Sequence, residues 1–341
     1  MQIVYLSARP QVFAQTWAHV QRFMPWVNRA VVVVPSALAE QFRTIVTDVD
    51  IVTDEAVTSM STAEITALSH VPRNVTLRRA VISTPAVDEV FLLSDDDYRP
   101  LKPIDESFFT HDGRDVGYYC YDLGHWPGDE TDFDVAQHRT LRTLKYKDFP
   151  HVMFGSHMPQ LMRKDLWNRA FEVFDSVNDV NMVCEWSLYF NVAMALEPER
   201  FVPPRIFQTL CWPQFPGEWP LWVQPDGPSF ENYYPDLYSR GGLFEGLAVD
   251  ASAVDLEREN FTKVTRWYEF ATRQRDLDFG EVSNPWASTK TRSLAFRALS
   301  LARKPFGYLQ AGQAAELVEL QGQVAQLSAE LRSQRSPGTT D

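Results

Sequence analysis

Apolar runs alternate with segments of helical periodicity along the first third of the chain. The runs at residues 1–6, 30–34 and 50–52 have the length and continuity of buried strands. Between them, residues 13–24 carry apolar side chains at helical spacing, and residues 37–46 favour a second helix. This β-α-β-α-β order predicts a parallel sheet with right-handed crossovers, whose strands end at the same edge.

The next apolar run, residues 90–94, leads into three consecutive carboxylates, Asp95, Asp96 and Asp97, and is stopped by Pro100. Its lack of alternation predicts a strand covered on both faces. Adjacent aspartates repel one another and are poor strand formers, so we expect them at the strand's carboxyl end, where open α/β sheets bind ligands. A hard divalent cation, Mg²⁺ or Mn²⁺, would relieve this repulsion. The alternative is a solvated turn in which an aspartate caps the next segment.

Polar residues follow two other strands of the predicted sheet. Ser7 and Arg9 come after the first strand and Asp54 after the third, so we expect them at the same edge as the aspartates. The planar fork of Arg9 suits a diphosphate, and Asp54 can accept from a nucleobase or ribose; a surface role is the alternative for each. The helix predicted at 74–83 carries Arg78, which either neutralises the aspartates, meets a substrate phosphate or lies on a solvated face.

Two downstream residues are candidates for proton transfer. Glu185 is an acid in an apolar, aromatic setting beside Trp186. Burial would make its carboxylate a stronger base, suited to an acceptor hydroxyl, or the acid merely stabilises the start of a helix. His157 lies in a turn-like segment before a helix predicted at 164–177, as a ligand, a base, an acceptor contact or a structural residue.

The segment 211–238 is aromatic and proline-rich, too irregular for a strand or a helix. Its tryptophans Trp212, Trp219 and Trp222 predict a platform for pyranose rings, or a loop held against the core by its own aromatic side chains. Residues 255–276 then predict a long helix.

The C-terminal residues differ in character. Segment 288–305 is basic without acids and has leucines between its charges, so it either touches an anionic membrane surface or an acidic neighbouring domain. From 317 to 331, apolar residues recur at alternating spacings of three and four. This short heptad seam predicts a homo-oligomer formed through the C-terminal helix. Residues 333–341 are expected to be disordered.

Composition narrows the class of protein. The chain has 341 residues, 45% hydrophobic and 23% charged, which is enough to bury a sizeable core. Its net charge of −13 argues against sequence-independent binding to nucleic acid. The three cysteines fit neither a disulfide framework nor a zinc site. Without a basic, apolar leader or an apolar run of spanning length, we expect a cytoplasmic protein with no transmembrane segment.

A nucleotide-binding β-α-β half that ends in a strand with an Asp-x-Asp cluster resembles the GT-A fold of nucleotide-sugar glycosyltransferases, over roughly residues 1–225. In that family the last aspartate usually binds the metal that bridges the donor's diphosphate, and the first often contacts ribose or sugar. The resemblance implies Asp97 as a metal ligand, Asp95 as a second ligand or a nucleotide contact, and Asp96 as a nucleotide contact. The remaining nucleotide contacts would be Ser7, Arg9, Asp54 and Arg78.

Glu185 fits the acid that GT-A enzymes commonly place ahead of an apolar helix on the acceptor side. The resemblance implies Glu185 as a catalytic residue. We also expect His157 to be catalytic and Trp186 to contact the acceptor. The chain departs from the family in one respect. Many members supply a histidine ligand beyond this acid, whereas every histidine here lies at or before His157.

We therefore expect an α/β catalytic domain at 1–280 with a mixed, mostly parallel sheet flanked by helices, as in the GT-A fold. Residues 1–110 would bind the nucleotide sugar and 111–280 the acceptor, followed by a helical tail at 281–332. The expected activity is metal-dependent transfer of a hexose from a nucleotide-diphosphate sugar to a carbohydrate acceptor. A faint similarity to actinobacterial enzymes that elongate intracellular polysaccharides makes GDP-mannose the first donor to test, with UDP-sugars next.

Two alternatives stay open. The order of Pro25-Trp26-Val27, the acidic strand and a histidine-proline segment faintly resembles Stealth-type sugar-phosphate transferases of capsule synthesis, which move a sugar phosphate. A protein with the same fold that binds sugar without catalysis, and assembles through its heptad tail, is the other alternative.

Overall fold

The computed structural model describes residues 1–126, 131–210 and 227–280. The larger of its two compact units comprises Met1–Gln214 and Pro220–Glu269. The helices and strands of the described residues belong to that unit, except for the turns beyond Glu269 of the helix Leu256–Gly280.

Several predicted features lie outside the described residues. They are Trp212, Trp219 and Trp222, the basic segment 288–305, the tail at 281–332 with its heptad seam, and the end at 333–341.

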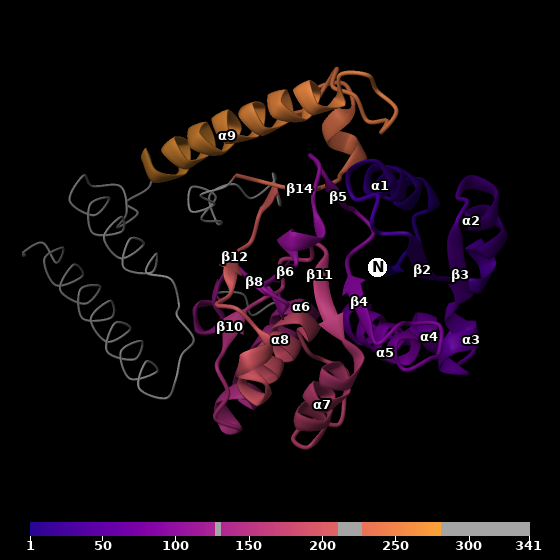
Figure 1. Ribbon diagram of the computed structural model, residues 1–341, viewed down its shortest axis with the longest axis vertical. Coiled ribbons are helices and arrows are strands. Elements are labelled where there is room, and N and C mark those ends of the chain that lie inside the picture. Colours follow the sequence, from indigo (N-terminus) through magenta and orange to yellow (C-terminus); the bar gives the residue numbers. More distant parts are fainter. Residues whose placement is uncertain (127–130, 211–226, 281–341) are drawn as a thin grey trace, which may run out of the picture. The chain divides into compact units, whose positions relative to one another are not determined.

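The first half of the chain builds one five-stranded sheet, shown in Figure 1. Its order is β11-β4-β1-β2-β3, in which β4, β1, β2 and β3 are parallel and β11 runs antiparallel to β4. The mixed, mostly parallel sheet predicted from the sequence is confirmed. The strands are β1 (Gln2–Leu6), β2 (Arg29–Val34), β3 (Val49–Thr53), β4 (Val90–Leu93) and β11 (Gln160–Arg163).

Helices flank this sheet. The chain moves in one direction from β1 to β3 and then returns to β4, so right-handed crossovers carry the helices of the two passages over opposite faces, as Figure 1 shows. The first passage holds α1 (Pro10–Phe23) and α2 (Ala39–Ile45), and the return holds α3 (Asp54–Thr58), α4 (Thr62–Ala67) and α5 (His70–Ile82).

The buried face of α1 is the apolar stripe predicted for residues 13–24. Phe13, Trp17 and Val20 are all buried. The ring of Phe13 meets Tyr5 of β1 edge-on, with 5.3 Å between centroids, and also contacts Phe42 of α2. Each large apolar side chain buried in this way stabilises the fold by about 1.5–3 kcal/mol.

The chain from residue 98 onwards adds short strands and longer helices. A three-stranded sheet has the order β13-β14-β5, and three two-stranded pairs are β9 with β10, β8 with β12 and β6 with β7. The strands are β5 (Tyr98–Pro100), β6 (Thr110–His111), β7 (Arg114–Asp115), β8 (Tyr118–Tyr119), β9 (Tyr121–Asp122), β10 (Val152–Met153), β12 (Arg205–Ile206), β13 (Thr209–Leu210) and β14 (Phe230–Asn232). The helices are α6 (Asp132–Tyr146), α7 (Lys164–Asp175), α8 (Glu185–Leu196) and α9 (Leu256–Gly280).

Helix α8 is apolar around almost its whole circumference, and ten of its residues are buried. A helix that is hydrophobic on all sides belongs in an interior. It packs beside α7, the helix predicted at 164–177, and its first residue is Glu185. The sequence prediction of an apolar helix behind this acid is confirmed.

A buried charge cluster joins the end of the described chain to the strand after the aspartates. Arg99 of β5 is fully buried and donates to Glu231 of β14, and also to the hydroxyl of Tyr238 at 2.8 Å. Lys263 of α9 donates to the same Glu231 carboxylate at 2.8 Å. Glu231 thus ties β5, β14 and α9 together.

None of the helices in the described ranges combines the length and the apolar character that a membrane crossing requires.

Candidate active site

The three aspartates occupy the turn between β4 and β5, which confirms their predicted position at the strand's carboxyl end. Ser94 still donates its N–H to a β1 carbonyl at 3.2 Å. Beyond it, the N–H of Asp95 donates to the carbonyl of His157 at 3.2 Å, and the carbonyl of Asp97 accepts from Tyr233 at 2.6 Å. The backbone of the triplet is therefore held from both sides.

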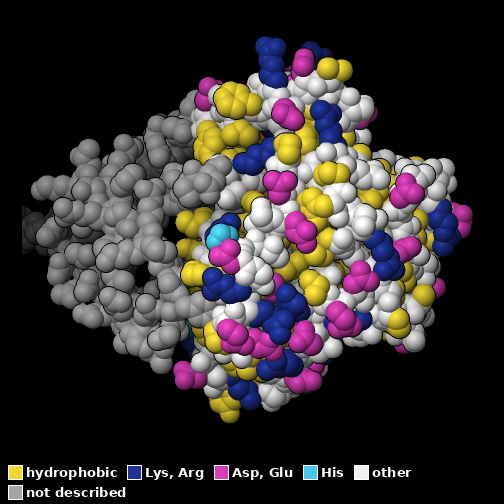
Figure 2. All heavy atoms as spheres, viewed as in Figure 1, with side chains coloured by type: hydrophobic (Ala, Val, Ile, Leu, Met, Phe, Trp, Pro, Cys, Tyr) yellow, Lys and Arg dark blue, Asp and Glu magenta, His cyan; other side chains and the backbone are white. Residues whose placement is uncertain are grey.

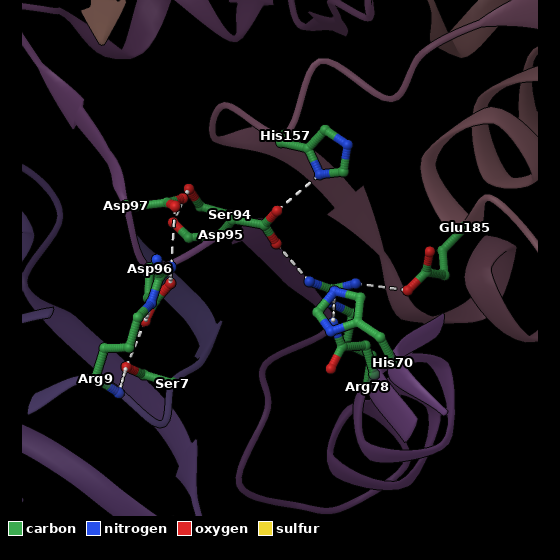
Figure 3. Close-up of polar contacts among 11 residues, drawn as sticks. Ser7, Arg9, His70, Arg78, Ser94, Asp95, Asp96, Asp97, His157 and Glu185 are labelled. Atoms are coloured by element: carbon green, nitrogen blue, oxygen red, sulfur yellow. Dashed lines mark hydrogen bonds and ion pairs between the residues drawn. The ribbon is translucent and has the colours of Figure 1, made fainter. Parts of the chain in front are cut away.

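One set of side chains, here named the Arg9 group, consists of Ser7, Arg9, Asp96 and Asp97. The Ser7 hydroxyl donates to Asp96 Oδ2 at 2.5 Å. Arg9 donates to both oxygens of Asp96, and its Nη2 also donates to Asp97 Oδ2 at 2.9 Å. Figure 3 shows these residues together on one side of the turn. The end of β1 and the acidic turn thus meet, as the parallel sheet predicts.

A second set, the Arg78 group, consists of Arg78, Asp95, His157 and Glu185. Asp95 points away from its two neighbours in Figure 3, and its carboxylate binds Arg78 and, at 2.7 Å, Nδ1 of His157. The other arm of Arg78 donates to Glu185 Oε1 at 2.6 Å. The guanidinium also lies over the ring of Trp186, 4.5 Å from its centroid. The fork of Arg78 therefore links the acidic turn to the start of α8.

His157 is held in an unusual backbone conformation. Its φ is +57°, in the left-handed region that non-glycine residues rarely adopt. Such a residue costs of order 1–3 kcal/mol and persists only when its surroundings fix it. Here Asp95 contacts both the carbonyl and the ring of His157, and the rings of Tyr98 and Trp186 lie against it. Strain of this kind is typical of functional sites.

The two groups differ in their electrostatics. Burial by itself raises the pKa of Asp95, but Arg78 and His157 outweigh it and lower the pKa to about 2. Burial raises the pKa of Asp97 to about 6; Arg9 opposes this rise and the neighbouring carboxylates add to it. Burial alone would lower the pKa of His157, but Asp95 raises it. Asp95 is thus a compensated anion, whereas Asp97 has too little positive charge around it.

The charge balance fits a divalent cation at the Arg9 group. Two carboxylates face one guanidinium in each group, Arg9 in one and Arg78 in the other, which leaves one negative charge in excess in each while His157 is neutral. In the described ranges, no three His, Cys, Asp or Glu side chains are arranged to hold a metal by themselves. Mg²⁺ commonly needs only one or two carboxylates alongside substrate phosphates, and Asp96 and Asp97 offer such a pair.

Two further predicted site residues have other surroundings. Asp54 is buried at the end of β3, and its Oδ1 accepts from the N–H of Ser36 at 3.0 Å and of Glu55 at 2.9 Å. It therefore caps a turn at the same edge of the sheet. Trp186 is buried and packs on Arg78. Their roles as nucleotide and acceptor contacts stay predictions.

Tyr98 and Glu231 were not among the residues predicted for the site. Tyr98 directly follows the triplet, and its ring stacks on His157 with 6.1 Å between centroids. Its position next to the aspartates was the only signal. Glu231 binds Arg99, 132 residues away in the chain, and nothing local marks that pairing.

Neither a family model nor a curated protein matches this chain. Among solved structures, galactosyltransferase LgtC in complex with donor and acceptor sugar analogs is 13% identical at a TM-score of 0.39, over 84% of this chain and 99% of that one. Mouse xyloside xylosyltransferase 1 is 11% identical at a TM-score of 0.38, over 69% and 99%. Glycosyltransferase GlyE of Streptococcus pneumoniae TIGR4 is 10% identical at a TM-score of 0.36, over 81% and 63%. These likenesses are distant.

Proposed function

We propose that the protein is a GT-A-type glycosyltransferase that takes its sugar from a nucleotide-diphosphate donor. The observation that carries this proposal is the fork of Arg78, which binds Asp95 of the acidic turn and Glu185 of α8 at once. A transferase has to bring a site for the leaving diphosphate next to a site for the acceptor hydroxyl. A carboxylate from each of the two expected halves binds the same buried guanidinium here.

The Arg9 group is the proposed diphosphate site. Asp97 is the proposed metal ligand, because its buried carboxylate lacks compensating charge and is next to a second carboxylate, Asp96. Asp95 would join it as a ligand on leaving Arg78 or His157. A bound Mg²⁺ or Mn²⁺ would neutralise charge on the leaving diphosphate. Ser7 orients Asp96 through its 2.5 Å hydrogen bond.

The Arg78 group is the proposed acceptor side. Glu185 and His157 are the two candidate proton acceptors, and they differ in what they contact. Glu185 is ion-paired with Arg78 through its Oε1. Asp95 accepts from Nδ1 of His157 and so fixes the orientation of that ring. Trp186 packs on the His157 ring and on Arg78, the partner of Glu185.

We further propose that the protein transfers a hexose to a carbohydrate acceptor, with GDP-mannose as the first donor to test and UDP-sugars next. We also propose that it is cytoplasmic and forms a homo-oligomer through the tail.

Thermal unfolding against a panel of nucleotides and nucleotide sugars, with and without Mn²⁺ or Mg²⁺, tests the function. A ligand that binds only the native state raises the unfolding temperature, so one nucleotide should do so in a metal-dependent manner. No response to any nucleotide would overturn the proposal and favour a non-catalytic protein. Product analysis with the donor so identified then separates sugar transfer from the sugar-phosphate transfer of Stealth-type enzymes.

A further inference from the structure

Arg9 caps two buried carboxylates with one guanidinium. Its Nη2 donates to Asp96 and, at 2.9 Å, to Asp97, while its Nε donates to the second oxygen of Asp96 at 3.3 Å. The side chains of Asp96 and Asp97 are 6% and 11% exposed, whereas that of Arg9 is 47% exposed. The carboxylates are therefore fixed in the interior, and the cation above them is open to solvent.

The two ends of Arg9 are held differently. Its backbone N–H donates to the Ser7 hydroxyl at 3.1 Å, and its carbonyl accepts from Phe13 in the first turn of α1 at 3.0 Å. Its guanidinium is held only by the two aspartates among the contacts of the described residues. The side chain can therefore leave the carboxylates without any rearrangement of the sheet.

A cation beside these carboxylates stabilises their ionised forms. Asp96 and Asp97 are adjacent, both are buried, and like charges at this distance destabilise each other. Without Arg9, two ionised carboxylates would face each other with no counter-charge of their own. A divalent ion that binds both carboxylates would compete with the guanidinium, because Arg9 already contacts both oxygens of Asp96 and one oxygen of Asp97.

We propose that Arg9 is an exchangeable counter-ion: it pairs with Asp96 and Asp97 in the donor-free protein, yields them to the divalent cation, and then binds the donor's diphosphate. This inference rests on the proposed function. It makes Arg9 a donor-positioning residue whose effect on metal binding is opposite in sign to its effect on nucleotide binding. An ordinary phosphate contact would leave the affinity for metal alone unchanged, and a purely structural residue would support both kinds of binding.

The test uses Arg9→Met, which keeps an unbranched apolar stem and removes the charge. Mn²⁺ binding is measured by calorimetry or by electron paramagnetic resonance without nucleotide, and GDP and UDP binding is measured at saturating Mn²⁺. We expect Mn²⁺ alone to bind about tenfold more tightly to the variant, and the nucleotide to bind at least about tenfold more weakly, the range for losing a charged hydrogen bond. Without metal, the variant should unfold at a lower temperature than the wild type, and Mn²⁺ should restore it.

Arg29→Met is the matched control. Arg29 also bridges two aspartates, Asp50 and Asp88, and its side chain is 42% exposed. It lies at the start of β2, at the opposite end of the parallel strands from the aspartate triplet. Its loss should leave Mn²⁺ and nucleotide affinities unchanged.

The outcomes separate this inference from the proposed function. Nucleotide binding with an Mn²⁺ affinity that is unchanged or weaker in Arg9→Met would overturn the exchange and leave the glycosyltransferase proposal standing. Metal-independent nucleotide binding would overturn the exchange and the metal together. A wild-type protein that binds no nucleotide under any condition would overturn the proposed function, and the inference with it.

Discussion

Adjacent side chains of the acidic run serve different neighbours. Asp95 joins Arg78 and His157, whereas Asp96 and Asp97 join Arg9. The residue types and their position at a strand end marked this site in the sequence. The division into two groups was not predictable, because the direction of each side chain depends on the backbone angles of a turn that distant segments hold in place.

Replacing Asp97 with asparagine tests the diphosphate site. The change removes a charged metal ligand and little volume, so metal-dependent nucleotide affinity and turnover should fall together, by about a hundredfold in turnover. Calorimetric titration with and without Mn²⁺ measures the first, and product formation the second. Asp88→Asn, which removes a surface partner of Arg29, should behave like the wild type. Metal-dependent turnover that survives in Asp97→Asn would contradict the metal assignment.

Glu185→Gln separates proton transfer from positioning. Glutamine keeps the shape and can still accept from Arg78, but it is no base, so kcat should fall by about 10²–10⁴-fold with donor affinity preserved. The measurement is steady-state kinetics for donor and acceptor. Glu197→Gln is the control, because Glu197 also pairs with arginines, at the other end of α8. Near-normal turnover would make Glu185 a structural acid and leave proton transfer to His157.

Helices and strands that depend on contacts between nearby residues were predicted from the periodicity of the sequence. The strands β1, β2 and β4 and the buried face of α1 follow from runs and stripes within a few residues. The sheet that joins β5, β14 and β13 did not. The prediction that segment 211–238 is too irregular for a strand was wrong at Phe230–Asn232, because β14 is stabilised by partners that are far away in the chain. The cluster of Arg99, Glu231 and Lys263 has the same origin: three charges from three distant segments compensate one another in the interior.

The attachment of α9 gives a prediction about pH. Burial lowers the pKa of Lys263 from its ordinary 10.5 to about 8. Between these values the folded protein binds fewer protons than the unfolded chain, so the free energy of unfolding should rise with pH across this window, by about 3 kcal/mol from this residue. Lys263→Met should lack that contribution.

Urea unfolding at several pH values between about 7.5 and 10.5 measures this effect. Lys145→Met, on the exposed face of α6, is the control and should keep the wild-type slope. If the free energy of unfolding of Lys263→Met changes with pH as steeply as that of the control, Lys263 stays charged throughout this range. The contact with Glu231 would then outweigh burial.

Charged side chains are distributed over the surface of the protein rather than gathered. On the face in Figure 2, the described basic side chains are interspersed with acidic ones. The net charge of −13 therefore does not form one acidic patch on that face. The basic segment 288–305 lies outside the described residues, so its contact with a membrane surface or an acidic domain stays a prediction.

The heptad seam is testable by truncation. Removing the chain after Tyr308 deletes the apolar repeat at 317–331, so the mass measured by light scattering should fall to that of a smaller assembly. Nucleotide binding should be nearly unchanged, since the Arg9 and Arg78 groups lie before residue 190. Truncation after Ser333 keeps the repeat and is the control. Equal masses for both truncated proteins would remove the claim that the seam drives association.

Substitutions of Asp95 and of Glu185 affect the same side chain, because Arg78 donates to both carboxylates. Among the hydrogen bonds of the described residues, none joins Asp95 to Glu185. Both carboxylates accept from Arg78, so replacing either one leaves this buried guanidinium with one partner fewer. Their free energies of substitution should therefore be non-additive, with an interaction energy of about 0.5–3 kcal/mol in a double-mutant cycle. The pair Asp95 and Asp97 behaves differently, because removing the negative charge of one carboxylate relieves the electrostatic repulsion on the other. Two residues that are neighbours in the chain thus oppose each other, while two that are ninety positions apart act as a single unit.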